Sequence, residues 1–230
     1  MQPSIELTSH CNNSCVFCPH QHNPIKRGFM EWDLFTELVD DLAPQSEALM
    51  LFSRGEPFLH PTVYKMIEYA NKKCPVIIST NAILVDVKRL YDVFKEGTLC
   101  VSCPGGNQET YKLLTGSDSF GIVREKIRQL VTSKPERINL YVKMVKQKEN
   151  EGQGEELKKL CKNVAVVDDS NNPNLHNYTE CSQPDVSPTY RFDGQKVVCC
   201  RDWNCEYPYV QYYEQAKKRE LPLCANCGIQ

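Results

Sequence analysis

The sequence predicts an α/β fold in which six β/α units form a parallel sheet, followed by a small cysteine-rich domain. Short apolar runs typical of buried strands alternate up to residue 167 with segments that space apolar residues at helical intervals. The polar motifs follow the strand-like runs, where ligands gather on parallel sheets. Beyond residue 167 this alternation stops and cysteines become frequent. We therefore expect two domains, residues 1–167 and 168–230.

The apolar pattern places each element of the first domain. Strands are expected at residues 4–8, 48–52, 76–81, 99–102, 138–145 and 164–167. Helices are expected at residues 30–39, 61–72, 87–95, 120–131 and 155–161, with a solvated connection at 148–156. Because the strands alternate with helices, they should run parallel with right-handed crossovers. The pattern leaves open whether the six units form a partial barrel or an open sheet.

The second domain begins with residues 168–180, which are rich in Asp, Ser, Asn and Pro and are expected to be a linker. Residues 189–198 are expected to form a β-hairpin with Asp-Gly as its turn, and residues 208–219 a helix. Residues 171–180 and the aromatic tract 202–213 are candidates to line a substrate entrance, although aromatic residues at such a helix more often belong to a core.

Composition and charge limit the classes of function and partner that the chain can have. Hydrophobic residues make up 41% of the chain and charged residues 24%, as in ordinary globular proteins. A formal net charge of -2 offers no attraction for nucleic acid or an anionic membrane, so neither is an expected partner. No apolar run reaches the roughly 18 residues of a membrane-spanning helix, and the first residues lack the apolar core of a signal peptide. We expect a cytoplasmic protein.

Thirteen cysteines are many for a cytoplasmic chain of 230 residues. In a reducing compartment they indicate metal binding rather than disulfides, and their odd number and uneven clustering agree with this interpretation. Cys100 and Cys103 have CxxC spacing, but residues three apart on a strand point to opposite faces, so the two are not expected to share a metal. Cys100 is expected in the core, and Cys103 has no assigned role. Cys74 and Cys161 are expected to be small buried apolar residues.

Cys11, Cys15 and Cys18 fall within one short segment directly after the first expected strand. Thiolates are soft ligands that suit iron–sulfur clusters, zinc or copper(I). Three thiolates would leave one iron of a [4Fe–4S] cluster with an open coordination site, whereas a structural zinc site needs four protein ligands. On its own, the triad is also compatible with half of a zinc site or with buried thiols.

This CxxxCxxC spacing resembles the signature of the radical S-adenosylmethionine (SAM) superfamily. The resemblance implies a partial (β/α)6 barrel in which the three cysteines hold a [4Fe–4S] cluster, with Phe17 of the motif in the cofactor site. It also implies that the open iron chelates SAM. An electron from a partner such as flavodoxin or ferredoxin would then cleave SAM to a 5′-deoxyadenosyl radical.

Gly55-Glu56-Pro57, after the second expected strand, resembles the GEP motif of this family. The resemblance implies that its backbone and its carboxylate receive the amino group of SAM, and a carboxylate suits such a charge-assisted hydrogen bond. Alone, Gly-Glu-Pro is a common turn. Arg54 stands where the family usually has another glycine, and its side chain is expected to reach the SAM carboxylate, the substrate or solvent.

Ser79-Thr80-Asn81-Ala82, after the third expected strand, resembles the TNG turn of the family, with Ala82 in place of the usual glycine. The resemblance implies that Ser79, Thr80 and Asn81 face the carboxylate and ribose of SAM. Ser102, at the end of the fourth strand, occupies another position that commonly contacts SAM. The competing interpretation is the ordinary polarity of strand ends.

Cys181, Gly194 and Cys199 form a Cx12Gx4C pattern, which resembles the first auxiliary-cluster motif of the SPASM/twitch subgroup. The resemblance implies that Cys224 and Cys227 complete the ligands of an auxiliary [4Fe–4S] cluster. A four-cysteine zinc ribbon is the competing interpretation of the same spacing.

Only Cys200 and Cys205 remain in this region, too few for a second auxiliary cluster. The pattern therefore resembles the shorter twitch form, with a single auxiliary cluster. Cys200 is the alternative ligand to Cys199, which the Gx4C spacing favours.

The resemblance implies a radical SAM oxidoreductase that removes hydrogen from an unreactive C–H bond. We expect a two-electron oxidation of a small polar molecule assisted by the auxiliary cluster, with modification of a peptide or protein as the alternative. From another class, the chain could be a non-catalytic iron–sulfur electron carrier or a zinc-stabilised binding module.

No side chain is assigned as the catalytic base. Arg54, Lys143 and Asp202 are candidates, and Lys143 and Lys146 are also candidates to face the cavity. Leu113-Leu114-Thr115-Gly116 resembles the loop that follows the fourth strand in many members of the family.

Overall fold

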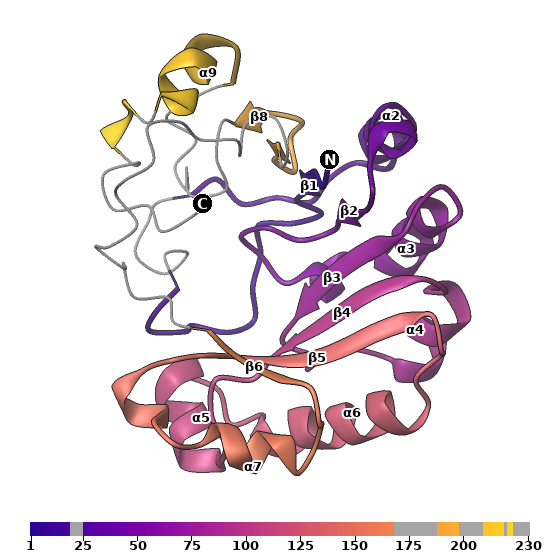
Figure 1. The fold of residues 1–230 in the computed structure, drawn as a ribbon. Coiled ribbons are helices and arrows are strands. Elements are labelled where there is room, and N and C mark those ends of the chain that lie inside the picture. Colours follow the sequence, from indigo (N-terminus) through magenta and orange to yellow (C-terminus); the bar gives the residue numbers. More distant parts are fainter. Residues whose placement is uncertain (19–24, 168–187, 198–208, 219, 223–230) are drawn as a thin grey trace.

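The computed structural model describes residues 1–18, 25–167, 188–197, 209–218 and 220–222 (Figure 1). Seven residues that we singled out in the second domain lie outside these ranges, so the expectations that rest on them stay predictions. They are Cys181, Cys199, Cys200, Asp202, Cys205, Cys224 and Cys227.

The described strands form one sheet with the spatial order β6-β5-β4-β3-β2-β1-β7-β8. The first six follow the order of the chain and run parallel, as predicted. Among the described residues β6 and β8 each have a single neighbour, so the sheet is open, and the partial barrel stays a prediction. The bounds are β1 (Ser4–Ile5), β2 (Leu49–Met50), β3 (Val76–Thr80), β4 (Gly97–Ser102), β5 (Ile138–Val145), β6 (Val164–Val167), β7 (Thr189–Tyr190) and β8 (Lys196–Val197).

Helices α2 to α7 lie along one side of this sheet in Figure 1. The helices expected from the apolar spacing are present, with ends that differ by a few residues. No helix in the described ranges is long and apolar enough to cross a membrane. The bounds are α2 (Trp32–Leu42), α3 (Val63–Asn71), α4 (Val87–Val93), α5 (Gln108–Thr115), α6 (Phe120–Thr132), α7 (Gly154–Lys158) and α9 (Tyr209–Lys217).

Helix α5 corrects the expectation of a loop at Leu113–Gly116, because these residues end the helix. The side chain of Asn107 accepts a hydrogen bond from the amide of Thr110 at 2.9 Å and so caps the first turn. Gly116 takes the left-handed conformation, φ 70°, that commonly ends helices. The two capping residues were the available signal, but the short apolar pattern between them hid the helix.

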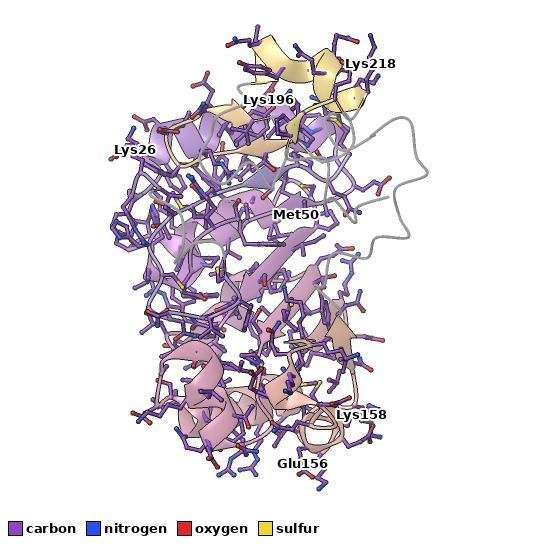
Figure 2. All side chains as sticks on the ribbon, turned by 90° about the vertical axis from the view of Figure 1, so that its left-hand side faces the viewer. Lys26, Met50, Glu156, Lys158, Lys196 and Lys218 are labelled. Carbon is purple, nitrogen blue, oxygen red and sulfur yellow. The ribbon has the colours of Figure 1, made fainter. Side chains whose placement is uncertain are left out.

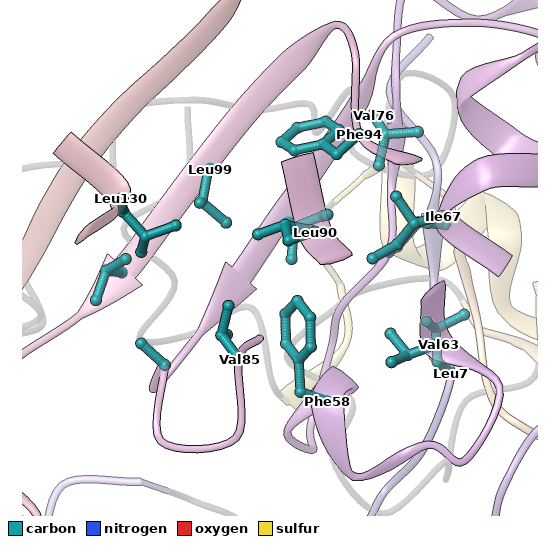
Figure 3. Close-up of a cluster of buried hydrophobic side chains, with 14 of the residues drawn as sticks. Leu7, Phe58, Val63, Ile67, Val76, Val85, Leu90, Phe94, Leu99 and Leu130 are labelled. Atoms are coloured by element: carbon teal, nitrogen blue, oxygen red, sulfur yellow. The ribbon is translucent and has the colours of Figure 1, made fainter. Parts of the chain in front are cut away.

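The core lies between the helices and the face of the sheet that they cover (Figure 3). Burial alternates along β5. Ile138, Leu140, Val142 and Met144 are buried, while the residues between them are exposed or only partly buried. Leu90 and Phe94, on and just after α4, are fully buried against this face. Each such large apolar side chain contributes about 1.5–3 kcal/mol on burial.

The scattered cysteines lie largely in this interior. Cys100 and Cys161 are buried, as predicted, and Cys103 is buried as well. Cys74 is only half-buried, where full burial was expected.

The C-terminal hairpin forms as predicted, with β7 antiparallel to β8 and Gly194 at φ 83° in the turn. Its first strand also pairs in parallel with β1, so that Ser4 lies opposite Thr189. The hairpin that we placed in the second domain therefore extends the main sheet. Figure 2 shows Lys196 of this hairpin at one end of the molecule and Glu156 and Lys158 at the opposite end.

The segment 148–156 is not simply a solvated connection. Residues Lys148–Asn150 form a 3₁₀ helix, and the side chain of Asn150 is completely buried. Its amide nitrogen donates to the carbonyls of Pro104 and Val145, both at 2.7 Å, while its oxygen accepts from the amide of Gln147. Asn150 thus holds the loop that follows β4 onto the end of β5.

Candidate active site

A pocket of about 310 Å³ opens at the C-terminal ends of the parallel strands. It brings together the three cysteines of the N-terminal triad and every residue predicted to bind SAM except Pro57, which begins a neighbouring 3₁₀ helix. The lining residues are Cys11, Asn13, Cys15, Phe17, Cys18, Phe52, Ser53, Arg54, Gly55, Glu56, Ser79, Thr80, Asn81, Ser102, Pro104, Thr115, Lys143 and Val145.

The cysteine loop is fastened to the C-terminus of α5. The amide of Ser14 donates to the carbonyl of Thr115 at 2.9 Å, and the amide of Val16 donates to the carbonyl of Leu114 at 3.0 Å. The last carbonyls of a helix have no partner within it, so the loop supplies the donors that α5 lacks. Between Cys15 and Cys18 the loop closes a turn with a 3.0 Å hydrogen bond from amide to carbonyl.

The donor set fits an iron–sulfur cluster. Burial raises the pKa of the Cys15 thiol to about 12 and also raises the pKa of Cys11, and Cys18 adds to both shifts. The raised pKa values favour the protonated thiols of Cys11 and Cys15, and metal binding would displace these protons. Within the described ranges no three Cys, His, Asp or Glu side chains are placed to hold a single ion. Thiolates are soft ligands that suit iron–sulfur clusters, and three cysteines line this one pocket.

Gly55 lets the loop after β2 lie directly against the chain after β1. A Cβ atom at this position would come within 2.2 Å of the carbonyl oxygen of Thr8 and 2.6 Å of that of His10. The next amide, that of Glu56, donates to the carbonyl of His10 at 2.8 Å. The glycine of the GEP motif is thus required by this close approach.

Glu56 joins the ends of β2 and β3. Its carboxylate accepts hydrogen bonds from the hydroxyl of Thr80 at 2.6 Å, the amide of Asn81 at 2.7 Å and the amide of Phe58 at 3.1 Å. Burial nevertheless raises the pKa of Glu56 to about 7. The carboxylate predicted to receive the amino group of SAM therefore also holds the loops that form this side of the pocket.

The turn after β3 is held from two sides. Asn81 donates from its side chain to the side-chain oxygen of Asn12, beside the first cysteine, at 2.7 Å. Ala82, which replaces the expected glycine, has φ 64° and is the one non-glycine residue with positive φ in the described chain. Left-handed backbone at alanine costs about 1–2 kcal/mol, which the hydrogen bond from its amide to Thr80 helps to offset.

Arg54 does not point to solvent, which was one of our expectations; it is buried at the wall of the pocket. Its guanidinium binds the fully buried Glu6 of the first strand segment through two hydrogen bonds of 2.7 Å, and its backbone amide adds a third at 3.2 Å. A guanidinium engaged in this way is unsuited to act as a base.

The carboxylate of Glu6 also contacts the C-terminal hairpin. Arg191, fully buried after β7, lies 3.4 Å from Glu6 and donates to the hydroxyl of Ser53 at 2.8 Å. The Glu6–Arg54–Arg191 group, which we call the buried ion cluster, therefore ties β1, the loop after β2 and the hairpin together. Sequence reasoning missed Glu6 and Arg191, because nothing in a single sequence relates residues so far apart.

At the ends of β4 and β5, fewer of the described side chains are held by hydrogen bonds than after β2 and β3. Ser102 and Lys143 lie opposite one another in the parallel register, and both line the pocket. Lys146, our other candidate to face the cavity, is exposed and is absent from the lining of this pocket. Pro104 contributes to the wall because Asn150 holds its loop.

The model of the family described as Radical SAM superfamily covers residues 5–161. The matched region includes the cysteine triad, Gly55–Pro57, Ser79–Asn81 and Lys143.

Among curated proteins, the chain resembles the tungsten-containing aldehyde ferredoxin oxidoreductase cofactor-modifying protein of Pyrococcus furiosus, with 30% identity over 171 residues, 70% of this chain and 48% of that protein. It is 37% identical over 95 residues to the Fe-coproporphyrin III synthase of Methanosarcina barkeri, covering 38% of this chain and 23% of that protein. The chain spans about half or less of the length of these curated relatives.

Two solved structures share the fold at low sequence identity. The structure of BtrN in complex with AdoMet and 2-DOIA matches with a TM-score of 0.65 and 16% identity, covering 99% of this chain and 93% of that one. SuiB of Streptococcus suis bound to precursor peptide SuiA matches with a TM-score of 0.67 and 13% identity, covering 86% of this chain and 60% of that one.

Proposed function

The chain belongs to the radical SAM superfamily, and from this premise we propose that its pocket binds a [4Fe–4S] cluster and SAM and carries out reductive SAM cleavage. Cys11, Cys15 and Cys18 would hold the cluster, and SAM would lie along Gly55–Pro57 and Ser79–Asn81, with Phe17 and Ser102 as further contacts. The observation that supports this most is the common pocket, which gathers the triad and the SAM motifs from four strand ends.

When bound, the cluster and SAM supply an electron and a 5′-deoxyadenosyl radical that can take hydrogen from an unreactive C–H bond. The residues of the chain bind and orient SAM and the substrate and shield them from water. Glu56 offers a negatively charged group to the amino group of SAM while its three donors keep it in place. Phe17 and Phe52 supply apolar surface that helps to exclude water from the pocket.

We further propose that the reaction is a net two-electron oxidation of a small polar molecule. The substrate would lose a hydrogen atom to the radical, then one electron to an auxiliary [4Fe–4S] cluster at Cys181, Cys199, Cys224 and Cys227, and a proton to solvent. The electron for SAM cleavage would come from a reducing partner such as flavodoxin or ferredoxin. The hairpin between the first two of these ligands extends the sheet, and its neighbour Arg191 binds Ser53 in the wall of the pocket, which supports an auxiliary cluster near the site.

A small substrate is favoured by the names of the relatives, which include a cofactor-modifying protein, Fe-coproporphyrin III synthase and GTP 3',8-cyclase. These names also include a synthase and a cyclase, so the class of oxidoreductase rests on the auxiliary cluster alone. Peptide modification is the second candidate, because SuiB, which shares the fold, has been solved with its precursor peptide.

The test is anaerobic reconstitution, followed by metal analysis and a dithionite-driven assay for 5′-deoxyadenosine. The wild type is compared with the Cys11/Cys15/Cys18→Ala triple variant. We expect about eight irons per chain in the wild type and about four in the variant, with SAM cleavage only in the wild type.

The other outcomes are equally informative. About four irons and one zinc, with cleavage retained, would preserve the enzyme but contradict the electron-accepting auxiliary cluster. A wild type that is fully loaded with iron and does not cleave SAM would contradict the proposed function and favour an electron carrier or a binding module.

A further inference from the structure

The lining of the pocket contains three charged side chains besides the cysteines among the described residues, namely Arg54, Glu56 and Lys143. A charged group in a partly dry pocket is stable only with a partner of opposite charge or with strong hydrogen bonds. The question for each of the three is therefore whether the protein itself supplies that partner.

Two of the three are fully engaged with the protein. Arg54 forms a two-pronged ion pair with Glu6, both of whose contacts are 2.7 Å. Glu56 accepts three hydrogen bonds of 2.6 to 3.1 Å from Thr80, Asn81 and Phe58. Neither side chain can move to a new position without breaking contacts within the protein, although the carboxylate of Glu56 can still accept a hydrogen bond from the amino group of SAM where it stands.

Lys143 is different. It is half-buried on the open face of β5, and its cross-strand neighbours are Ser102 on β4 and Ala165 on β6, neither of which is acidic. In the described part of the chain no carboxylate forms an ion pair with its ammonium group, and no hydrogen bond from that group is present. Among the described residues, Lys143 is therefore the one positive charge of the pocket without a compensating partner.

The position of Lys143 separates it from the groups expected to bind SAM. Those groups follow β2, β3 and β4, and Ser102 at the end of β4 is the last of them. Lys143 stands one strand further along the sheet, at the same level as Ser102. A molecule that lies beside SAM in this direction would meet the ammonium group first.

We propose that Lys143 binds a carboxylate or phosphate group of the substrate, so that the pocket selects small anionic molecules. This inference rests on the proposed function and adds the chemical class of the substrate. Lysine suits the role because its compact ammonium group acts as a point charge for phosphate and carboxylate oxygens. SAM also contains a carboxylate, so the experiment has to distinguish these two sources of negative charge.

The experiment is a binding titration without turnover, on reconstituted protein with oxidised cluster and saturating SAM. The probes are inorganic phosphate and succinate, with neutral succinamide as the control compound. The variants are Lys143→Met and Lys143→Arg, with Lys146→Met as the matched control, because Lys146 is an exposed lysine three residues further along. SAM affinity is measured separately for each variant.

We expect both anions, but not succinamide, to bind the wild type, and Lys143→Met to weaken their binding at least tenfold. Lys143→Arg should retain most of the affinity because it keeps the charge, and Lys146→Met should stay within twofold of the wild type. Equal anion binding by wild type and Lys143→Met would overturn the proposal. So would a wild type that binds neither anion.

One further outcome assigns the charge to the cofactor. If Lys143→Met weakens SAM binding tenfold and leaves the anion probes unaffected, Lys143 pairs with the SAM carboxylate and the substrate proposal is wrong. Failure of the proposed function appears elsewhere, as a loaded wild type that forms no 5′-deoxyadenosine. The anion titration requires no turnover, so the two failures are distinguishable.

Discussion

The two sides of the pocket are built in opposite ways. At the ends of β1, β2 and β3, the protein itself supplies the partners of the charged side chains: the members of the buried ion cluster bind one another, and a hydroxyl and backbone amides bind Glu56. At the ends of β4 and β5, Ser102 and Lys143 face the pocket without such partners among the described residues. The first side is therefore shaped before any ligand binds, whereas the second has polar groups left for a ligand.

This difference agrees with the division of labour that we propose. A cofactor that is the same in every reaction of a superfamily can be met by a rigid, pre-organised surface. A substrate that differs between members has to be met by side chains that are free to change without loss of the fold. The expected effects of substitution should accordingly fall from the first side to the second.

The largest effect is expected at the buried ion cluster. Glu6→Gln would leave two buried guanidinium groups without their carboxylate and should lower the free energy of unfolding by about 3–5 kcal/mol. Asp193→Asn is the matched control, because it removes the exposed ion pair of Lys26 with the same hairpin and should cost at most about 1 kcal/mol. Chemical denaturation measures the free energy of unfolding of both variants. Similar losses in the two would contradict the distinction between the buried ion cluster and the exposed ion pair.

The next effect is a pH dependence caused by Glu56. Because burial raises its pKa from 4.5 to about 7, the folded protein holds this proton more tightly than the unfolded chain. Its contribution is therefore fully present below pH 4.5 and is lost as the pH rises to about 7, by about 3 kcal/mol in total. Denaturation curves across this window should show the loss in the wild type and not in Glu56→Gln. Parallel curves for the two proteins would count against a buried, protonated Glu56.

A smaller effect is expected where the loop after β2 approaches the chain after β1. Gly55→Ala forces a methyl group against the carbonyl of Thr8 and should destabilise the protein by about 1–3 kcal/mol, with weaker SAM binding. Gly121→Ala is the control, since nothing lies within 4 Å of its added methyl group in α6. There the helix should gain about 0.5–1 kcal/mol. Thermal melts and SAM titrations of both variants check the contrast.

The smallest effect is expected on the side of the pocket formed by the ends of β4 and β5. Lys143→Met removes a side chain that makes no ion pair in the described chain, so the free energy of unfolding should change by less than about 1 kcal/mol. The same denaturation assay measures it. A loss as large as that of Glu6→Gln would show that the two sides are built alike and that the comparison is wrong.

The sequence was sufficient to predict the parallel sheet, the place of each of its first six strands and the meeting of the triad with the SAM motifs. These features depend on local periodicity and on the rule that strand ends of a parallel sheet share one edge. It was not sufficient to predict the partners of Arg54, because Glu6 and Arg191 lie far away along the chain. The burial of Asn150 was missed for a related reason, since its polar neighbours in the sequence indicated a solvated segment.

The pairing of β1 with β7 has a consequence for how the protein is made. Ser4 leaves the ribosome long before Thr189, yet the two residues lie opposite each other. Until the hairpin is synthesised, Glu6 can reach Arg54 but not Arg191, and β1 has an unpaired edge. Contacts between residues so distant in sequence form slowly. The nascent chain therefore completes the buried ion cluster beside its pocket only after the hairpin is synthesised, and until then the edge of β1 is open to pairing with other chains.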